Sequence, residues 1–263
     1  MELSKERWLE IGKLLPNIPD TQKRVITLSP SMVALVTGPH SRLDVACVCL
    51  QDACDVACDA VYALTQAHAN LAWFREDISD APNELGAIIK SRFYIDDIAL
   101  RLYAAAEHTA NFIICYLNIG KDDLEPYEKK HSSLQQRVGR YVLNEYPTHE
   151  ISSYIQALVA EESWKNTMRY RNTWVHEQPP LIDNVGIVSK RRARWSKNGN
   201  IYKLGFTSSD PPEYTVDQLL QMTSLATHAF GNMLEKLTSM FICFLEDSGI
   251  TFKEDSDKIS MTL

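Results

Sequence analysis

The sequence predicts an all-α protein whose main body is an antiparallel four-helix bundle, with an extra long N-terminal helix and a small inserted β-hairpin. Apolar residues recur at three- and four-residue steps over several long segments, which is the period of an amphipathic helix. Prolines, glycines and capping residues stand at the ends of these segments. The chain has 263 residues, 45% of them hydrophobic, and can therefore bury a sizeable core.

The first 42 residues are predicted to be an irregular lead-in with one short helix. Four prolines interrupt this region: Pro16, Pro19, Pro30 and Pro39. The opening segment, MELSKERWLEIGKLL, has the pattern of a short amphipathic helix and lacks the layout of a secretory signal. A single helical domain is then expected over residues 43–250. It begins with a long helix over residues 43–74, which we expect to lie along the side of the bundle.

The bundle itself is predicted to extend over about residues 88–247. Its four helices are expected at about 88–119, 131–145, 149–176 and 216–247. Ser132 and Ser133 each stand three residues before a glutamine, and Thr215 stands three residues before Gln218. This is the spacing of a capping box, so it marks the starts of the second and fourth helices. Short links between the helices favour antiparallel neighbours.

Two segments do not have a helical pattern. Residues 186–206 carry β-branched and aromatic residues on both sides of Asn198-Gly199, which is a strong signal for a hairpin turn. We therefore expect a two-stranded ribbon inserted before the last helix. Residues 251–263 are predicted to be a mobile tail.

The whole-chain composition narrows the class of protein. The formal net charge is −7, which argues against a surface covered by nucleic acid but permits a local basic site. The sequence contains no apolar run long enough to predict a membrane span. Six unevenly placed cysteines indicate reduced thiols rather than a disulfide scaffold, and so a cytoplasmic location.

The most informative stretch is WKNTMRYRNTWVHEQPP, residues 164–180, which ends the third bundle helix. Asn172 and His176 are four residues apart and lie on one helix face. Arg171 and His176 are five apart and diverge by about 140° on an ideal helix, so both reach one ligand only if the arginine extends round the last turn. Arginine binds phosphate bidentately and histidine transfers a proton, so the set suits a phosphate group.

The arrangement of Arg171, Asn172 and His176 resembles the R-x4-6-H motif of the HEPN superfamily. In that family a polar residue often follows the arginine, and the motif lies near the end of the third helix of a four-helix bundle. The resemblance implies a metal-independent endoribonuclease, often a toxin or phage-defence effector, that forms a homodimer with a shared cleft. RNA is the implied substrate, and an antitoxin or other regulatory protein is an implied partner.

The resemblance also implies a role for each motif residue. His176 would act as general base toward a ribose 2′-hydroxyl or as general acid toward the leaving oxygen. Arg171 would stabilise the charge that builds on the scissile phosphate. Asn172 would orient the histidine or bind the phosphate. The alternative is that Arg171 and His176 only cap the helix end, in a catalytically silent bundle that binds nucleotide, RNA or a protein partner.

A second basic region follows the motif. The predicted ribbon contains no acidic residue from Ile187 to Phe206. Its mixture of cations and aromatics suits contacts to a nucleic-acid backbone and stacking on bases, although a solvated edge ribbon is the commoner explanation of such a pattern. The residues that we predict to bind RNA are Arg169, Lys190, Arg191, Arg192, Arg194, Trp195 and Lys197.

A metal site is not expected. Cys47, Cys54 and Cys58 share a helix face and His68 follows, but zinc sites normally use closely spaced ligand pairs on turns. Packing of small apolar cysteines in a helix interface explains the pattern better. We therefore predict no metal and no cofactor.

Overall fold

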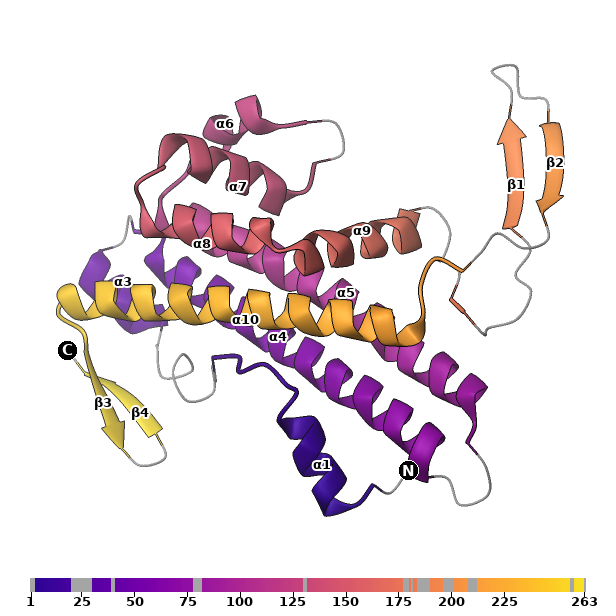
Figure 1. Cartoon of the computed structure of the whole chain (residues 1–263). Coiled ribbons are helices and arrows are strands. Elements are labelled where there is room, and N and C mark those ends of the chain that lie inside the picture. The colour runs from indigo at the N-terminus through magenta and orange to yellow at the C-terminus, as the bar shows by residue number, and fades with distance from the viewer. Residues whose placement is uncertain are drawn as a thin grey trace.

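The computed structural model describes residues 3–19, 30–38, 41–77, 82–129, 132–176, 180, 182–183, 190–195, 201–207, 212–255 and 258–262. The all-α prediction is confirmed, because long helices make up most of this part of the chain (Figure 1). Within the described ranges, no helix combines the length and the apolar character that crossing a membrane requires.

Helices α4 (Leu43–Ala72) and α5 (Glu84–Tyr116) pack against each other and form the most extensive helix–helix contact between described elements. A single π-helical turn, η1 (Trp73–Asp77), follows α4, and Asn83 caps α5 by accepting a hydrogen bond from the Gly86 amide. Small residues let the two backbones approach closely, because α4 turns a row of buried alanines to its neighbours: Ala46, Ala53, Ala57, Ala60, Ala63 and Ala67. Since α4 also packs on the last helix, it belongs to the core rather than to the side of a separate bundle.

The remaining body of the fold comes from α7 (Leu134–Glu145), α8 (Glu150–Ala160), α9 (Glu162–His176) and α10 (Val216–Asp247). The short turns α6 (Lys121–Leu124) and η2 (Glu125–Tyr127) precede them. The structure forms the capping boxes expected at Ser133 and Thr215. Figure 1 shows α10 running across α4 and α5, with α8 and α9 beside it and α7 outside them.

The third predicted helix is broken into two. At Glu161 the backbone has φ −66° and ψ 118°, an extended conformation that ends α8 before α9 begins at the next residue. The prediction of one continuous helix over 149–176 was wrong at this residue, because the apolar stripe continues across the break. The break allows α9 to take its own direction over α5 and α10.

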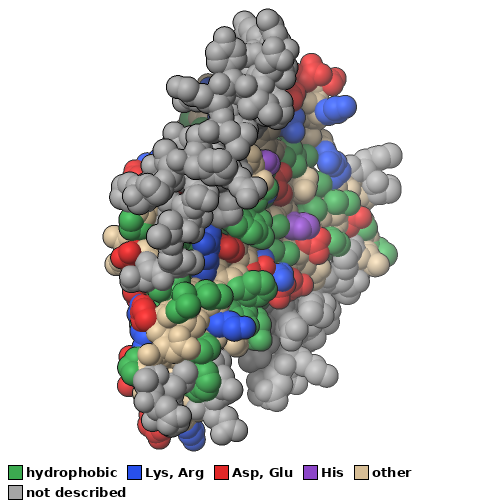
Figure 2. All heavy atoms as spheres, turned by 90° about the vertical axis from the view of Figure 1, so that its right-hand side faces the viewer, with side chains coloured by type: hydrophobic (Ala, Val, Ile, Leu, Met, Phe, Trp, Pro, Cys, Tyr) green, Lys and Arg blue, Asp and Glu red, His purple; other side chains and the backbone are tan. Residues whose placement is uncertain are grey.

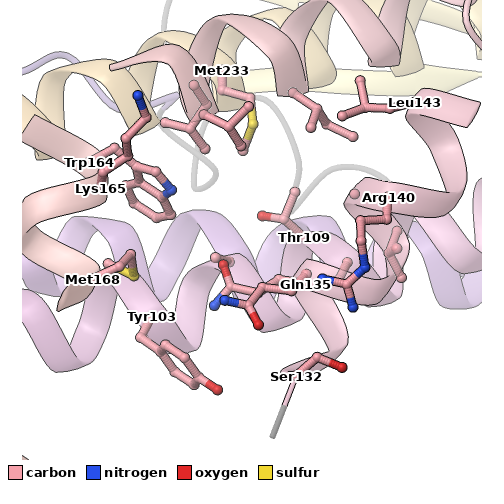
Figure 3. Close-up of a pocket in the computed structure, with 18 of the residues that line it drawn as sticks. Tyr103, Thr109, Ser132, Gln135, Arg140, Leu143, Trp164, Lys165, Met168 and Met233 are labelled. Atoms are coloured by element: carbon pink, nitrogen blue, oxygen red, sulfur yellow. The ribbon is translucent and has the colours of Figure 1, made fainter. Parts of the chain in front are cut away.

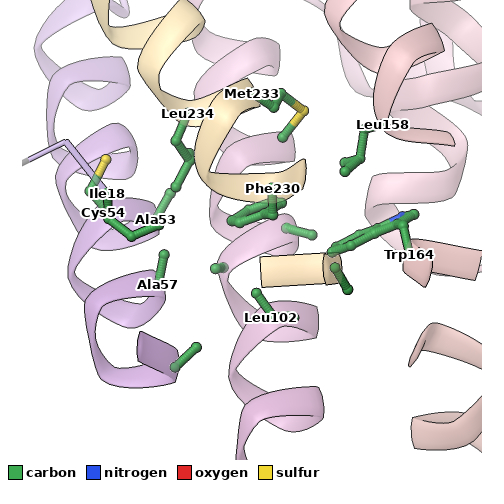
Figure 4. Packing of buried hydrophobic residues seen from close by; sticks show 14 of the residues in the cluster. Ile18, Ala53, Cys54, Ala57, Leu102, Leu158, Trp164, Phe230, Met233 and Leu234 are labelled. Carbon is green, nitrogen blue, oxygen red and sulfur yellow. The ribbon is translucent and has the colours of Figure 1, made fainter. Parts of the chain in front are cut away.

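The core lies where α4, α5, α9 and α10 meet (Figure 4). The indole of Trp164 stacks on the ring of Phe230, with an interplanar angle of 5° and 5.3 Å between centroids. Trp164 is only 6% exposed and Phe230 is fully buried. This stack fixes α9 to α10 at the start of the helix that carries the motif.

The described part of the N-terminal region contains more helix than its prolines predict. It contains the expected short helix, α1 (Lys5–Gly12), and also α3 (Pro30–Thr37), which the sequence prediction missed. Proline is compatible with the first turn of a helix, so Pro30 begins α3 instead of interrupting it. The chain after α1 packs closely on α10, since a Cβ at Gly231 would lie 2.8 Å from Ile18 Cδ1 and 3.1 Å from the Asn17 carbonyl oxygen.

Two small β-ribbons complete the described structure. Strand β1 (Lys190–Trp195) pairs antiparallel with β2 (Ile201–Thr207), with an irregularity between Arg194 and Trp195. Strand β3 (Thr251–Asp255) pairs antiparallel with β4 (Lys258–Thr262) inside the segment predicted as a mobile tail. The start of this ribbon is held against the helical body just after α10, because Ile250 is buried and Phe252 packs on the core. The strands are five residues each, too short for a clear sequence pattern.

Candidate functional site

The structure brings the three motif residues together at the C-terminal end of α9. Arg171 Nη1 lies 3.4 Å from His176 Nε2 and donates a hydrogen bond of 3.0 Å to Asn172 Oδ1. The helix continues as far as His176, so the two side chains start about 140° apart, as the sequence predicts. The contact forms because the long arginine side chain reaches round the last turn. Asn172 and His176 are exposed, which leaves the set open to a ligand.

An aromatic ring rather than a carboxylate positions the arginine. The Arg171 guanidinium carbon lies 3.7 Å from the centroid of the Tyr103 ring, which α5 contributes. Arg171 makes no salt bridge within the described residues, and its Nε is buried without a hydrogen-bond partner there. A cation–π contact holds the guanidinium without neutralising it. The positive charge therefore stays available to an anion.

A partly buried polar cluster around the buried Tyr170 fixes the rotation of α9. The Tyr170 hydroxyl donates a short hydrogen bond to Asp96 on α5, and Arg92 Nε lies 3.7 Å from the same carboxylate. Burial raises the pKa of Asp96, and burial together with the Asp96 charge raises the pKa of Tyr170 far above its usual range. Arg92 also donates to the carbonyl of Pro180, at 3.4 Å. Because Tyr170 precedes Arg171, this cluster sets the direction in which the motif arginine leaves the helix.

A cavity of about 850 Å³ opens beside the motif, between α5, α7, α8 and α9; we call it the α5–α9 cavity. Figure 3 shows Trp164 and Met168 facing Arg140 and Leu143 across it, with Gln135 between them. Its interior is mainly aliphatic and aromatic. Tyr103 and Asn172 line it too, so these two residues connect the cavity to the Arg171–His176 pair.

The charge of the α5–α9 cavity has one sign. Among the described residues, its lining contains four cationic residues and no aspartate or glutamate; the cations are Lys129, Arg140, Lys165 and Arg169. Three of them already have local partners, and one of the three is Arg169, which donates to Asn166 Oδ1 at 3.1 Å. Lys165 pairs with exposed Glu162 at 2.6 Å, and Arg140 donates to the Tyr127 carbonyl through Nε at 3.1 Å and Nη2 at 2.6 Å. In a chain of net charge −7, a mainly apolar cavity whose described charged residues are all cations favours an anionic ligand.

A second cavity of about 700 Å³ lies between α1, the end of α4 and α10; we call it the α1–α10 cavity. Its two arginines are paired with carboxylates inside the protein. Arg75 binds Asp217 at 2.8 Å and Glu84 at 2.6 Å, and Arg7 pairs with Glu10 at 2.9 Å. These charges stabilise the fold locally and leave little attraction for an anion.

The predicted RNA-binding residues fall into two groups. Arg169 lines the α5–α9 cavity and donates to Asn166 Oδ1 at 3.1 Å. Lys190, Arg191, Arg192, Arg194 and Trp195 form strand β1, whereas Lys197 lies outside the described residues. Figure 1 draws the β1–β2 ribbon beyond the end of α9. Figure 2 shows that the described basic and acidic side chains alternate over this side of the molecule, so the one-sign cavity is a local feature.

The sequence prediction missed Tyr103, Lys129, Arg140 and Lys165 as members of a site. Tyr103 lies on α5, Lys129 after η2, Arg140 on α7 and Lys165 on α9, and none of them forms a motif with its sequence neighbours. Only tertiary packing brings them round one cavity. The apolar stripe of α5 that includes Leu102 and Ala106 is the one signal that marks the face on which Tyr103 borders the core.

The cysteines on α4 have the environment of packed thiols. Burial raises the pKa of Cys47 to about 12 and that of Cys54 to about 12. A thiolate is the form that binds metal, so burial of this kind disfavours ligation. Among the residues that the structure describes, no three histidine, cysteine, aspartate or glutamate side chains are grouped as metal ligands would be.

No protein-family model, curated protein or solved structure matches this chain. The functional argument therefore depends on the geometry of the residues themselves.

Proposed function

We propose that this chain is a HEPN-like, metal-independent endoribonuclease that cleaves RNA with Arg171 and His176 at a cleft between two copies. The observation that carries the proposal is the 3.4 Å approach of Arg171 Nη1 to His176 Nε2 at an exposed helix end. Residues that serve only to cap a helix have no need to meet across about 140° of its surface. A guanidinium and an imidazole that face the same solvent can contact one phosphodiester.

The chemistry suits attack by the ribose 2′-hydroxyl. His176 accepts the 2′-hydroxyl proton, the 2′-oxygen bonds to phosphorus, and the bond from phosphorus to the 5′-oxygen breaks. The products are a 2′,3′-cyclic phosphate and a free 5′-hydroxyl. Arg171 stabilises the charge on the phosphoryl oxygens as this proceeds. Asn172 holds the guanidinium through its Oδ1 and thereby aims it.

The leaving 5′-oxygen needs a proton, and this requirement supports a homodimer. One imidazole cannot accept a proton from the 2′-hydroxyl and donate another at the same moment. A second copy of the chain would supply a protonated His176 to the leaving oxygen. Val175, beside His176, is 42% exposed, so an apolar side chain is available at the helix end for contact between copies.

The test is cleavage of a labelled RNA in the presence of EDTA. We expect the native chain to produce ends with 2′,3′-cyclic phosphate. His176→Ala should slow cleavage by about 10²–10⁴-fold, because it removes the proton-transfer group. Arg171→Ala should slow it by about 10²–10³-fold, because it removes charge stabilisation. His228→Ala is the matched control, since His228 lines the α1–α10 cavity and should leave the rate unchanged.

Mixing the two inactive variants tests the composite cleft. If two copies share one active site, mixed dimers of His176→Ala and Arg171→Ala combine the Arg171 of one copy with the His176 of the other in that site, and they should regain part of the activity. Cleavage by His176→Ala at the native rate, or no cleavage by a folded native dimer, would contradict the proposal. The second result would favour a silent bundle that binds a nucleotide or a partner.

A further inference from the structure

We propose that the α5–α9 cavity binds one nucleotide, with the base in its apolar interior and the phosphate at the rim formed by α9. This site deepens the proposed function and rests on it where the nucleotide is part of an RNA substrate. The cavity also predicts binding of a free nucleotide, which can be measured without any cleavage. The two proposals can therefore fail separately.

The size and interior of the cavity fit a flat ring. Its volume of about 850 Å³ lies within the range of small-molecule pockets, about 300–1,000 Å³. Trp164 and Met168 form one wall, and Tyr103 borders the side nearest the motif (Figure 3). Trp164 is held by its stack on Phe230, so this wall is rigid. A rigid aromatic and thioether wall favours a planar ligand over a flexible one.

The polar groups in the cavity match the edge of a base. Gln135 projects between the two walls, and no side-chain hydrogen bond to its amide occurs within the described residues (Figure 3). Its backbone amide is separately occupied, because it donates to Glu107 Oε1 at 3.3 Å. A side-chain amide offers one donor and one acceptor side by side, which is the pairing that base edges use. An acyl chain would leave this amide unsatisfied at a cost in affinity.

The cations place the phosphate. Lys165, Arg169 and Asn172 all line the cavity and follow one face of α9 at four- and three-residue steps. Asn172 accepts the hydrogen bond from Arg171, so this row leads from the cavity to the cleavage pair. A phosphate at Arg169 would therefore lie next to the phosphodiester at Arg171. Lys129 and Arg140 keep the opposite rim positive, and none of the described residues that line the cavity is a carboxylate that would repel an anion.

The experiment is calorimetric titration of the 263-residue chain with the four nucleoside monophosphates and their parent nucleosides. We expect one base to bind best, and its nucleoside to bind about tenfold more weakly because it lacks the charged hydrogen bonds. Arg169→Gln should lower nucleotide affinity to the level of the nucleoside and leave nucleoside affinity unchanged. Gln135→Leu should weaken both and reduce the difference between bases. Arg169 is exposed and Gln135 partly exposed, so both variants should fold.

Lys13→Gln in the α1–α10 cavity is the matched control and should bind as the native protein does. Failure of every monophosphate to bind the folded protein at millimolar concentration would overturn the inference. Equal nucleotide affinities for native and Arg169→Gln proteins would do the same. So would laurate binding more tightly than any nucleotide and insensitively to Gln135→Leu, which would assign the cavity to an acyl chain.

A second arm separates the sources of the nucleotide. Short RNAs that differ at one position are cleaved by native protein and by Gln135→Leu. If the base that binds best as a monophosphate is also preferred beside the cut, and Gln135→Leu removes that preference, the nucleotide belongs to the substrate. If binding occurs but cleavage is absent or indifferent to Gln135, the ligand is a free nucleotide, and the nucleotide site stands without the RNA role.

Discussion

The α5–α9 and α1–α10 cavities are similar in volume, about 850 and 700 Å³, but they differ in the charged residues that line them. In the α1–α10 cavity, arginines are paired with carboxylates that line the same space, as Arg75 is with Asp217. In the α5–α9 cavity, the charged side chains that the structure describes along the lining are all cationic. A hollow between helices is therefore weak evidence of a site. An excess of one sign of charge on its wall is the stronger evidence.

The largest expected difference between the cavities concerns their walls. Trp164→Ala should lower the free energy of unfolding by about 3–5 kcal/mol, because it removes a buried aromatic from its stack on Phe230. Leu225→Ala, at a residue that lines the α1–α10 cavity and is 52% exposed, should cost less than about 1 kcal/mol. Urea unfolding of both variants measures the difference. Equal losses of unfolding free energy in the two variants would show that the two walls contribute equally to stability.

The next difference concerns added negative charge. Gln135→Glu places an isosteric carboxylate among the cations of the α5–α9 cavity, where it would pair with them and repel a phosphate. We expect affinity for the best nucleotide to fall about 10- to 100-fold, which is about 1.4–2.8 kcal/mol. Gln221→Glu makes the same change in the α1–α10 cavity and should alter nothing measurable by calorimetry. A loss of similar size in both variants would point to net charge rather than to a site.

The helices could be predicted well, because each long apolar stripe keeps its period until a cap or a proline ends it. The break at Glu161 could not, since nothing in the local pattern distinguishes an extended residue from a helical one there. For the contact of Arg171 with His176, the sequence could state only a requirement: the arginine side chain must extend round the last turn of the helix. The Tyr103 stack and the α5–α9 cavity depend on how separate helices pack, which periodicity does not specify.

A smaller effect should distinguish the α1–α10 cavity by its pH dependence. His68 lines it, its Nε2 is buried without a partner in the described structure, and burial lowers its pKa. A histidine whose folded pKa is lowered contributes stability above its unfolded pKa of about 6.5, and this contribution is lost as pH falls through that value. His68→Gln should therefore lose less thermal stability than the native chain between pH 7.5 and pH 5. Parallel losses in the two proteins would show that His68 does not titrate differently on unfolding.

The smallest effect belongs to the ion pairs of the α1–α10 cavity. The hydrogen bond from Arg75 lowers the pKa of Asp217, so the pair stabilises the fold above the unfolded pKa of aspartate and loses this effect as pH falls below it. Asp217 is 59% exposed, so solvent screening limits the contribution. Arg75→Ala should cost about 1 kcal/mol or less at pH 7, as urea unfolding would measure. A loss above about 3 kcal/mol would show that the pair behaves as a buried one.

The cationic lining of the α5–α9 cavity also has a consequence for how ionic strength affects the rate at which RNA associates with the protein. The chain as a whole carries a net charge of −7 and repels a polyanion, whereas the cavity attracts it only at close range. At about 0.01 M salt the screening length is about 30 Å, and the repulsion extends over the molecule; at about 0.15 M it is about 8 Å. The association rate for the proposed substrate should therefore rise from very low salt to moderate salt before it falls, unlike the steady decline of a basic nuclease.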